Sequence, residues 1–188
     1  MTIGCVILAA GNASRFGGNK LLAEYRGKAL IRWACEAVPT DRVGPVCVVT
    51  QYADAASVAV EYGFAVIRNE HPELGISRSV ALGTSALMDR CKGILFLTAD
   101  QPLLRRKTVA ALADRFSRDP TRIVVPTAGG RRGSPCVFPA TLFPELLALA
   151  GDRGGSQVIR KRPELVTEVS VPEEELADVD TLEDLARL

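Results

Sequence analysis

The stretch "IGCVILAAGNASRFGGNK" (residues 3–20) begins with an apolar run and ends in a loop that contains glycines, an arginine and a lysine. A continuous apolar run predicts a fully buried strand at residues 3–10, as in a parallel sheet covered by helices on both faces. Glycines directly after such a strand let the backbone approach a ligand closely. From local chemistry alone, the loop is either a phosphate-binding loop or a plain surface turn.

The remaining sequence repeats this alternation of apolar runs and helical patterns. It predicts further strands at residues 45–50, 64–69, 93–100 and 122–127, and helices at 28–38, 54–63, 77–89 and 107–116, with Ser77 as an N-cap. Beyond residue 129 we expect a hairpin into "CVFP", a short helix at 141–149, a surface turn "GDRGG" at 151–155 and a return strand at 165–171. The predicted fold is a single three-layer α/β/α domain (residues 1–188). Its sheet is mostly parallel and Rossmann-like, with a small antiparallel addition near the C-terminus.

The composition argues against several classes of partner. The formal net charge is +1, with 23 basic and 22 acidic side chains in no like-charged block, so we expect no binding to nucleic acid. No stretch approaches the ~18 apolar residues that cross a bilayer, so we expect no membrane partner. The five scattered cysteines contain no C-x-x-C pair, which is typical of reduced thiols and favours a cytoplasmic location.

In open α/β sheets, ligands bind beyond the carboxyl ends of the strands, which directs attention to loops 11–20, 69–76 and 100–104. In the first of these loops, Gly11 and Gly17 can present backbone N–H groups to an anion. Arg15 and Lys20 add a planar fork of donors and a compact charge, which suits a polyphosphate. The Walker A and dinucleotide glycine patterns are both absent from this loop.

Two aspartates are candidates for a metal site. Asp100 follows the strand at 93–100, where it is either a helix cap or a ligand for Mg²⁺. Asp180 lies in "LADVDTLEDL" (residues 176–185), shortly after Asp178. Thr181 can cap the last helix, with Asp184 completing a capping box, but that local role leaves Asp180 unexplained.

Together these motifs resemble the MobA-like nucleotidyltransferases, and within that group the molybdenum cofactor cytidylyltransferase (MocA) type. The matching stretches, in order, are "LAAGNASRFGGNKLL", "NEHPELGISRSVALG", "TADQPL", "GRRGSPCVFP", "GDRGG" and "DVDTLEDL". The resemblance covers essentially the whole chain and implies a nucleotide-diphospho-sugar transferase-like fold. "LAAG" in place of "LAGG" favours the cytidylyl branch over the guanylyl branch.

The resemblance also implies roles for individual residues. Lys20 and Arg15 would bind the triphosphate, Asp100 would be the principal Mg²⁺ ligand, and Asp180 the second. The positions implied to contact the nucleotide or the second substrate are Ala9, Ala10, Gly11, Gly17, Asn69, Ser77 and Ser79. Two positions depart from the family pattern: Ser134 replaces the usual histidine of a G-H-P turn, and Leu182 replaces a proline.

The implied reaction is transfer of CMP from CTP to the terminal phosphate of molybdopterin, with release of pyrophosphate. An acceptor phosphate is already ionised at pH 7, so the reaction needs no general base, and the only histidine, His71, lies before Pro72 in a loop. The product would serve a molybdoenzyme or a cofactor-insertion partner. Two alternatives stay open. One is transfer of another nucleotide to a different small phosphate, such as a sugar phosphate. The other is a non-catalytic chaperone that binds a nucleotide or pterin.

Overall fold

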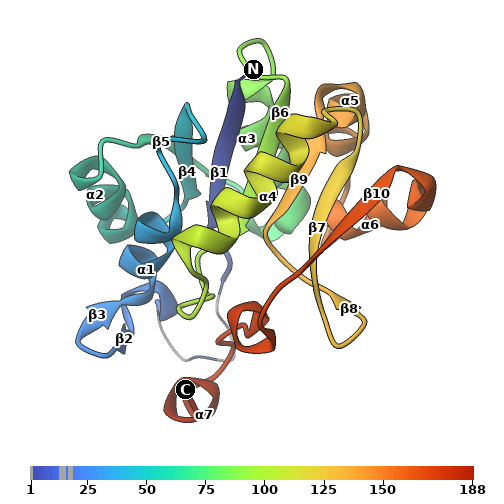
Figure 1. The fold of residues 1–188 in the computed structure, drawn as a ribbon. Helices are drawn as coiled ribbons and strands as arrows, with labels where there is room; N and C mark the ends of the chain where they lie inside the picture. The colour runs from blue at the N-terminus through green and yellow to red at the C-terminus, as the bar shows by residue number, and fades with distance from the viewer. Residues whose placement is uncertain (1, 13–15, 17–18) are drawn as a thin grey trace.

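The structure of the protein is a computed structural model, which describes residues 2–12, 16 and 19–188. A mixed sheet runs through its middle (Figure 1). In spatial order its strands are β10 (Val166–Ser170), β7 (Ile123–Ala128), β9 (Cys136–Pro139), β6 (Gly93–Thr98), β1 (Ile3–Ala9), β4 (Val46–Thr50) and β5 (Ala65–Arg68). The short strand β8 (Arg131–Arg132) pairs with β7.

Strand β1 lies at the centre of the sheet and pairs in parallel with β4 on one side and β6 on the other. Its side chains alternate between the two faces. Ile3, Cys5 and Ile7 belong to the core on one face, whereas Val6 belongs to the core on the other. Because both faces of β1 are covered, every position is apolar or small, as the predicted strand required.

Helices cover both faces of the sheet, which confirms the predicted three layers (Figure 1). On one face lie α1 (Leu30–Ala37), α2 (Ala53–Glu61) and α4 (Arg106–Arg118), whose apolar residues join the core that contains Ile7. On the other face lie α3 (Ile76–Leu87), α5 (Phe143–Leu147) and α6 (Gly155–Lys161), which join the core that contains Val6. Among the described residues, no helix is both long enough and apolar enough to cross a membrane.

The predicted antiparallel addition is present, and the structure shows where it lies in the sheet. Strand β9 lies inside the sheet, between β6 and β7, and is antiparallel to both. Its Phe138 packs edge-on against Phe96 of β6, with ring centroids 6.0 Å apart. The return strand β10 is parallel to β7 and forms an edge of the sheet. The addition is therefore an internal antiparallel strand followed by a parallel edge strand.

Several short elements had no counterpart in the prediction. A hairpin, β2 (Glu24–Tyr25) and β3 (Lys28–Ala29), precedes α1, which therefore begins at Leu30 rather than at residue 28. Helix α6 follows the loop at 151–154. The short 3₁₀ helices are η1 (Lys20–Leu22), η2 (Pro72–Leu74), η3 (Ala140–Leu142), η4 (Pro163–Leu165) and η5 (Glu173–Leu176).

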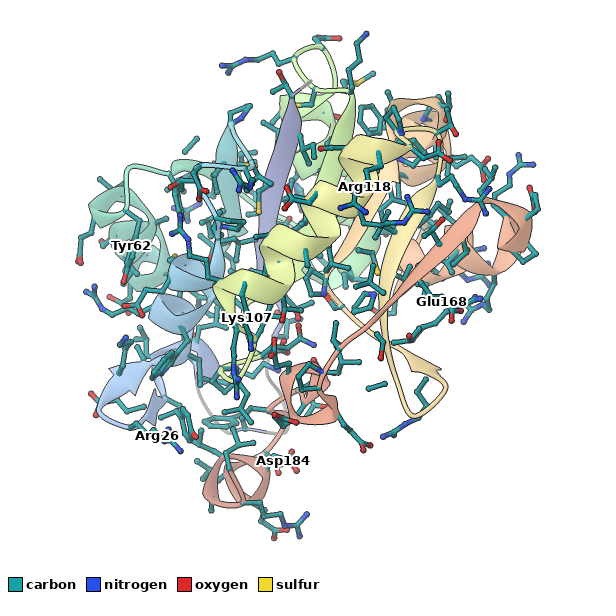
Figure 2. All side chains as sticks on the ribbon, in the orientation of Figure 1. Arg26, Tyr62, Lys107, Arg118, Glu168 and Asp184 are labelled. Atoms are coloured by element: carbon teal, nitrogen blue, oxygen red, sulfur yellow. The ribbon has the colours of Figure 1, made fainter. Side chains whose placement is uncertain are left out.

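The C-terminal segment, defined as η5 through α7 (Leu182–Ala186), lies beyond the carboxyl ends of the central strands (Figure 1). Its Val179 is fully buried in a small apolar cluster with Tyr25 and Leu30. The predicted capping box is confirmed: Thr181 Oγ1 accepts from the Asp184 N–H at 3.1 Å, and Asp184 Oδ2 accepts from the Thr181 N–H at 2.8 Å. Asp184 is labelled in Figure 2.

Candidate active site

A cavity of about 410 Å³ lies where β1 and β6 end. The residues that follow each strand contribute to its wall, as the topology of parallel sheets leads one to expect. Its lining comprises Leu8, Ala9, Ala10, Gly11, Asn12, Lys20, Leu21, Pro72, Gly75, Ile76, Ser79, Thr98, Ala99, Asp100, Asp152 and Asp180. The cavity thus joins the glycine loop, the start of α3, the end of β6 and the C-terminal segment.

The exit of β1 into the glycine loop is held by the last residue of β4 and by the two residues that follow it. Thr50 Oγ1 donates to the Ala9 carbonyl at 2.8 Å, and Gln51 Nε2 donates to the Ala10 carbonyl at 2.9 Å. The Tyr52 hydroxyl donates to the Gly11 carbonyl at 2.9 Å. These contacts fix the backbone at the cavity wall, and sequence reasoning had assigned them no role.

Lys20 projects from η1 between two carboxylates. Its Nζ donates to Asp100 Oδ2 at 2.7 Å, to Asp180 Oδ1 at 3.3 Å and to the Val179 carbonyl at 3.1 Å. The Asn19 side chain accepts from the Leu21 N–H at 3.2 Å and so caps the short helix that carries Lys20. Three segments far apart in sequence therefore meet at one ammonium group.

The charges around Lys20 shift the pKa of two groups. Burial alone would lower the pKa of Lys20, but the carboxylates of Asp100 and Asp180 raise it above its usual value, so the ammonium group stays charged. Nearby, desolvation followed by the charge of Asp100 raises the pKa of Asp178 to about 6. Among the described residues that line the cavity, three aspartates (Asp100, Asp152 and Asp180) accompany Lys20.

One carboxylate oxygen of Asp100 has no partner in the part of the chain that the structure describes. This atom, Oδ1, is buried. Buried polar atoms are nearly always paired, so such an oxygen suits a ligand. Together with Asp180 it offers hard oxygen donors of the kind that Mg²⁺ prefers.

Among residues 2–12, 16 and 19–188 there is no cluster of three or more His, Cys, Asp or Glu side chains placed to hold a metal. Mg²⁺ is commonly bound by one or two carboxylates together with substrate phosphates. Asp100 and Asp180 therefore fit a cation whose remaining coordination positions are open to a phosphate.

The other residues singled out from the sequence are placed differently. Ala9, Ala10, Gly11 and Ser79 line the cavity with Lys20, Asp100 and Asp180, whereas Asn69 and Ser77 do not, and Arg15 and Gly17 lie outside the described residues. Asn69 is buried: its Nδ2 donates to Ser79 Oγ at 3.1 Å, and its Oδ1 accepts from the His71 N–H at 3.0 Å. Asn69 thus supports a residue of the cavity wall without being part of that wall.

Ser77 is not the N-cap of the third helix. The N-cap of α3 is Gly75, and the Ser77 hydroxyl donates to the Leu74 carbonyl at 3.3 Å. The loop after α5 approaches this helix end closely, because the Ser77 N–H donates to the Gly151 carbonyl at 3.2 Å. Gly75 has a φ of +83°, and a Cβ there would lie 2.5 Å from Gly151 C and from Asp152 Oδ1. Only glycine fits, so the cap falls two residues earlier than predicted.

A second cavity, of about 530 Å³, adjoins the first and shares Leu8, Ile76, Thr98 and Asp152 with it. Its other lining residues are Val80, Phe96, Arg132, Gly133, Ser134, Cys136, Phe138, Leu146, Gly154, Gly155, Ser156, Ile159 and Arg160. Most of these are apolar, with two arginines among them. Arg132 also pairs with Glu168, labelled on β10 in Figure 2, at 2.8 Å.

Asp152 lies between the two cavities, although the loop "GDRGG" had been interpreted as a surface turn. In the sequence, the glycines on both sides of "DR" were the feature that pointed to this placement, because glycines permit the loop to pack closely on α3.

Comparison with known proteins identifies the class. Residues 5–166 match the family model of the MobA-like NTP transferase domain, and the chain belongs to this family. The fold is that of nucleotidyltransferases of the nucleotide-diphospho-sugar transferase type, as the resemblance implied.

Individual relatives agree with this membership. The chain is 30% identical over 129 residues to a probable molybdenum cofactor guanylyltransferase of Bacillus licheniformis, covering 67% of this chain and 62% of that protein. It is 28% identical over 165 residues to the purine catabolism protein PucB of Bacillus subtilis, covering 82% and 79%. The match thus spans about three fifths of the guanylyltransferase.

Among solved structures, Rv0371c of Mycobacterium tuberculosis H37Rv superimposes with a TM-score of 0.82 at 26% identity, covering 100% of this chain and 97% of that one. A further structure of Rv0371c is a complex with manganese.

Proposed function

We propose that the protein transfers CMP from CTP to the terminal phosphate of molybdopterin or its molybdenum-loaded form, releasing pyrophosphate. The observation that carries this proposal is the Lys20 ammonium group between Asp100 and Asp180, in a cavity walled by the backbone at Ala9–Gly11. Membership of the MobA-like family and relatives named for molybdenum cofactor transfer support it.

In this proposal the first cavity takes the nucleotide. Backbone groups of Ala9, Ala10 and Gly11 contact it, and Lys20 binds its triphosphate. The Asp100 and Asp180 carboxylates hold the Lys20 ammonium group in the cavity before the substrate enters. When the nucleotide binds, Lys20 exchanges one of these carboxylate contacts for a phosphate contact. Arg15 is proposed as a second cation for the same phosphates. Catalysis then depends on positioning and charge neutralisation.

Asp100 and Asp180 would hold the Mg²⁺ ion. The bound cation supplies positive charge next to the phosphates, where negative charge builds up during transfer. The complex of the structurally similar Rv0371c with manganese supports the proposal of a divalent cation.

The second cavity takes the acceptor. Its apolar wall, which includes Phe96 and Phe138, suits a flat heterocycle, and Arg132 suits an anionic group. An oxygen of the acceptor's phosphate attacks the α-phosphorus of the nucleotide. The new P–O bond forms as the bond from that phosphorus to the β-bridging oxygen breaks, and pyrophosphate leaves with the electron pair. The attacking oxygen is already ionised, so no side chain has to remove a proton.

Two nucleotides are candidates for the donor. "LAAG" favours CTP, whereas the relative in B. licheniformis is named a guanylyltransferase, so GTP is the second candidate. Ser134, which replaces the family's histidine, lines the second cavity and makes the acceptor equally worth testing. The product would pass to a molybdoenzyme or a cofactor-insertion partner in the cytoplasm.

The test is pyrophosphate release from CTP, GTP, UTP and ATP, each with molybdopterin, with its molybdenum-loaded form and with a sugar phosphate. Turnover only with CTP and a pterin acceptor supports the proposal. Turnover with GTP changes the base alone, and turnover with a sugar phosphate alone overturns the acceptor. Tight nucleotide binding without any turnover points instead to a non-catalytic chaperone.

A further inference from the structure

Hydrogen bonds donated by two backbone N–H groups join the C-terminal segment to the loop that leads from β6 to α4. At one end, the Val179 N–H donates to the Asp100 carbonyl at 2.9 Å. At the other end, the Arg105 N–H donates to Glu175 Oε2 at 3.1 Å. The stretches 100–105 and 175–179 therefore run side by side in opposite directions, tied near both ends. The first of these hydrogen bonds joins Asp100 to Val179, and Asp180 is the next residue after Val179.

Glu175 is an unusual residue for such a contact, because its side chain is 0% exposed. Burying a carboxylate costs free energy unless its oxygens are well satisfied. Here Oε2 has the Arg105 N–H, but Oε1 lies 3.6 Å from Arg105 Nε and has no hydrogen bond among the described residues.

Arg105 is the N-cap residue of α4, and its own side chain caps nothing there. Glu175 therefore places its charge at the positive end of the α4 dipole, which favours an anion. The contact fixes the geometry between two segments more effectively than it satisfies the buried group.

We propose that Glu175 is a positioning residue that sets the separation of the Asp100 and Asp180 carboxylates. It does so by holding the C-terminal segment against the start of α4. This inference rests on the metal site of the proposed function, but not on the identity of the nucleotide or the acceptor. Without the tie at Glu175, the restraints on Asp180 from that side would be concentrated near residues 178–179, in the Val179–Asp100 bond, the hydrogen bond between Asp178 and Gln101 and the burial of Val179.

The chain offers a matched control in the neighbouring Glu174. This residue lies on the same short helix and contacts the same arginine, at 3.7 Å from Arg105 Nη2, but its side chain is 55% exposed. The conservative variant is Glu175→Gln, because its amide oxygen can still accept from the Arg105 N–H. Glu175→Asp keeps the carboxylate, but its side chain is one methylene group shorter and would not reach the Arg105 N–H.

The experiment measures binding of Mn²⁺ alone to the full chain, by the electron paramagnetic resonance signal of free Mn²⁺. Wild type, Glu175→Ala, Glu175→Gln, Glu175→Asp and Glu174→Ala are compared, with a thermal melt of each. Loss of a residue that orients a metal ligand typically weakens binding 10–100-fold. We expect Glu175→Ala to weaken Mn²⁺ binding about tenfold or more, and Glu175→Gln and Glu174→Ala to stay within about threefold of wild type.

If Glu175→Ala does not fold, Glu175→Asp decides the question, because it should weaken binding while Glu175→Gln does not. A lower melting temperature with unchanged Mn²⁺ binding shows a purely structural role and overturns the proposal. Absence of Mn²⁺ binding by the wild type overturns it as well. If the variants show the expected pattern of Mn²⁺ binding but the protein releases no pyrophosphate, the positioning role of Glu175 is supported and the proposed reaction is refuted. Failure of the inference and failure of the proposed function can therefore be distinguished.

Discussion

The ammonium nitrogen of Lys20 lies 2.7 Å from Oδ2 of Asp100, although the two residues are separated by 80 positions in the chain. The two side chains are only 13% and 19% exposed, so salt screens their attraction less than it screens a surface pair. This contact places a permanent positive charge at the end of the central strands. A phosphate that enters the cavity meets a cation that is already oriented.

Replacing Lys20 by methionine should remove most of the turnover. The substitution keeps a side chain of similar length but loses the charge that would stabilise the transferring phosphate. We expect pyrophosphate release to fall by about 10²–10³-fold, as is typical when one such donor is lost. The control is Lys28→Met, since Lys28 lies in β3 and pairs with Glu36 at the surface. Near-wild-type rates in Lys20→Met would refute the assigned role.

The second cavity predicts a difference between neighbouring arginines. Arg132 lines that cavity, whereas Arg131 is 77% exposed and pairs with Glu173. Arg132→Gln should raise the KM for the acceptor about tenfold, the size of one lost charge-assisted hydrogen bond, and leave the KM for the nucleotide unchanged. Arg131→Gln should change neither constant. A rise in the nucleotide KM alone would place the acceptor elsewhere.

The close contact at Gly75 predicts a large effect of a single methyl group. Gly75→Ala forces an alanine into a φ of +83° and also drives its Cβ against Gly151. Gly63→Ala meets comparable backbone strain, with a φ of +72°, but has open space around the new atom. We expect about 1–3 kcal/mol of destabilisation from strain in each variant, and more in Gly75→Ala because overpacking adds to it. Urea unfolding measures both, and equal losses would contradict the contact.

The cysteines predict how the protein responds to pH and to thiol reagents. Burial raises the pKa of Cys35 and Cys47 to about 12, and that of Cys136 to about 12 as well. The unfolded chain loses these protons near pH 9, whereas the folded protein retains them, so stability is full below pH 9 and falls as the pH rises toward 12.

At pH 8 the buried thiols of Cys35 and Cys47 should therefore resist alkylation by iodoacetamide for hours in the native protein, because the thiolate is the reactive form. In guanidinium chloride all five cysteines should react within minutes. Rapid labelling of Cys35 or Cys47 in the native protein, located by mass spectrometry, would show that its surroundings differ from those described.

Much of the fold could be predicted because it depends on local patterns. The buried strands at the centre are continuous apolar runs, and the helices between them show one apolar face. The capping box at Thr181 was visible because both of its partners lie within four residues. The position of β9 was not predictable in this way, since the order of strands depends on contacts between distant segments. The β2–β3 hairpin was missed because two-residue strands show no periodicity.

In the candidate site too, residues with a local sequence signal were predictable and residues placed by distant contacts were not. Lys20, Asp100 and Asp180 were found because each follows a predicted strand or stands apart from local capping, and the structure places them together. Glu175 contacts Arg105, 70 positions away, and nothing in the residues next to Glu175 indicates this partner. Ser77 was misassigned because serine is a common N-cap, whereas here the close approach of Gly151 decides where the helix begins.

The contact between Lys20 and Asp180 has a consequence for how the protein is made. It joins residues 160 positions apart, so it cannot form until synthesis has passed residue 180 and the C-terminal segment has emerged from the ribosome. A nascent chain that has already folded its central sheet holds Lys20 and Asp100 without the second carboxylate. Completion of this site thus follows the folding of the central strands, and a proteolytic cut between Glu175 and Val179 that released the segment would return the site to that earlier stage.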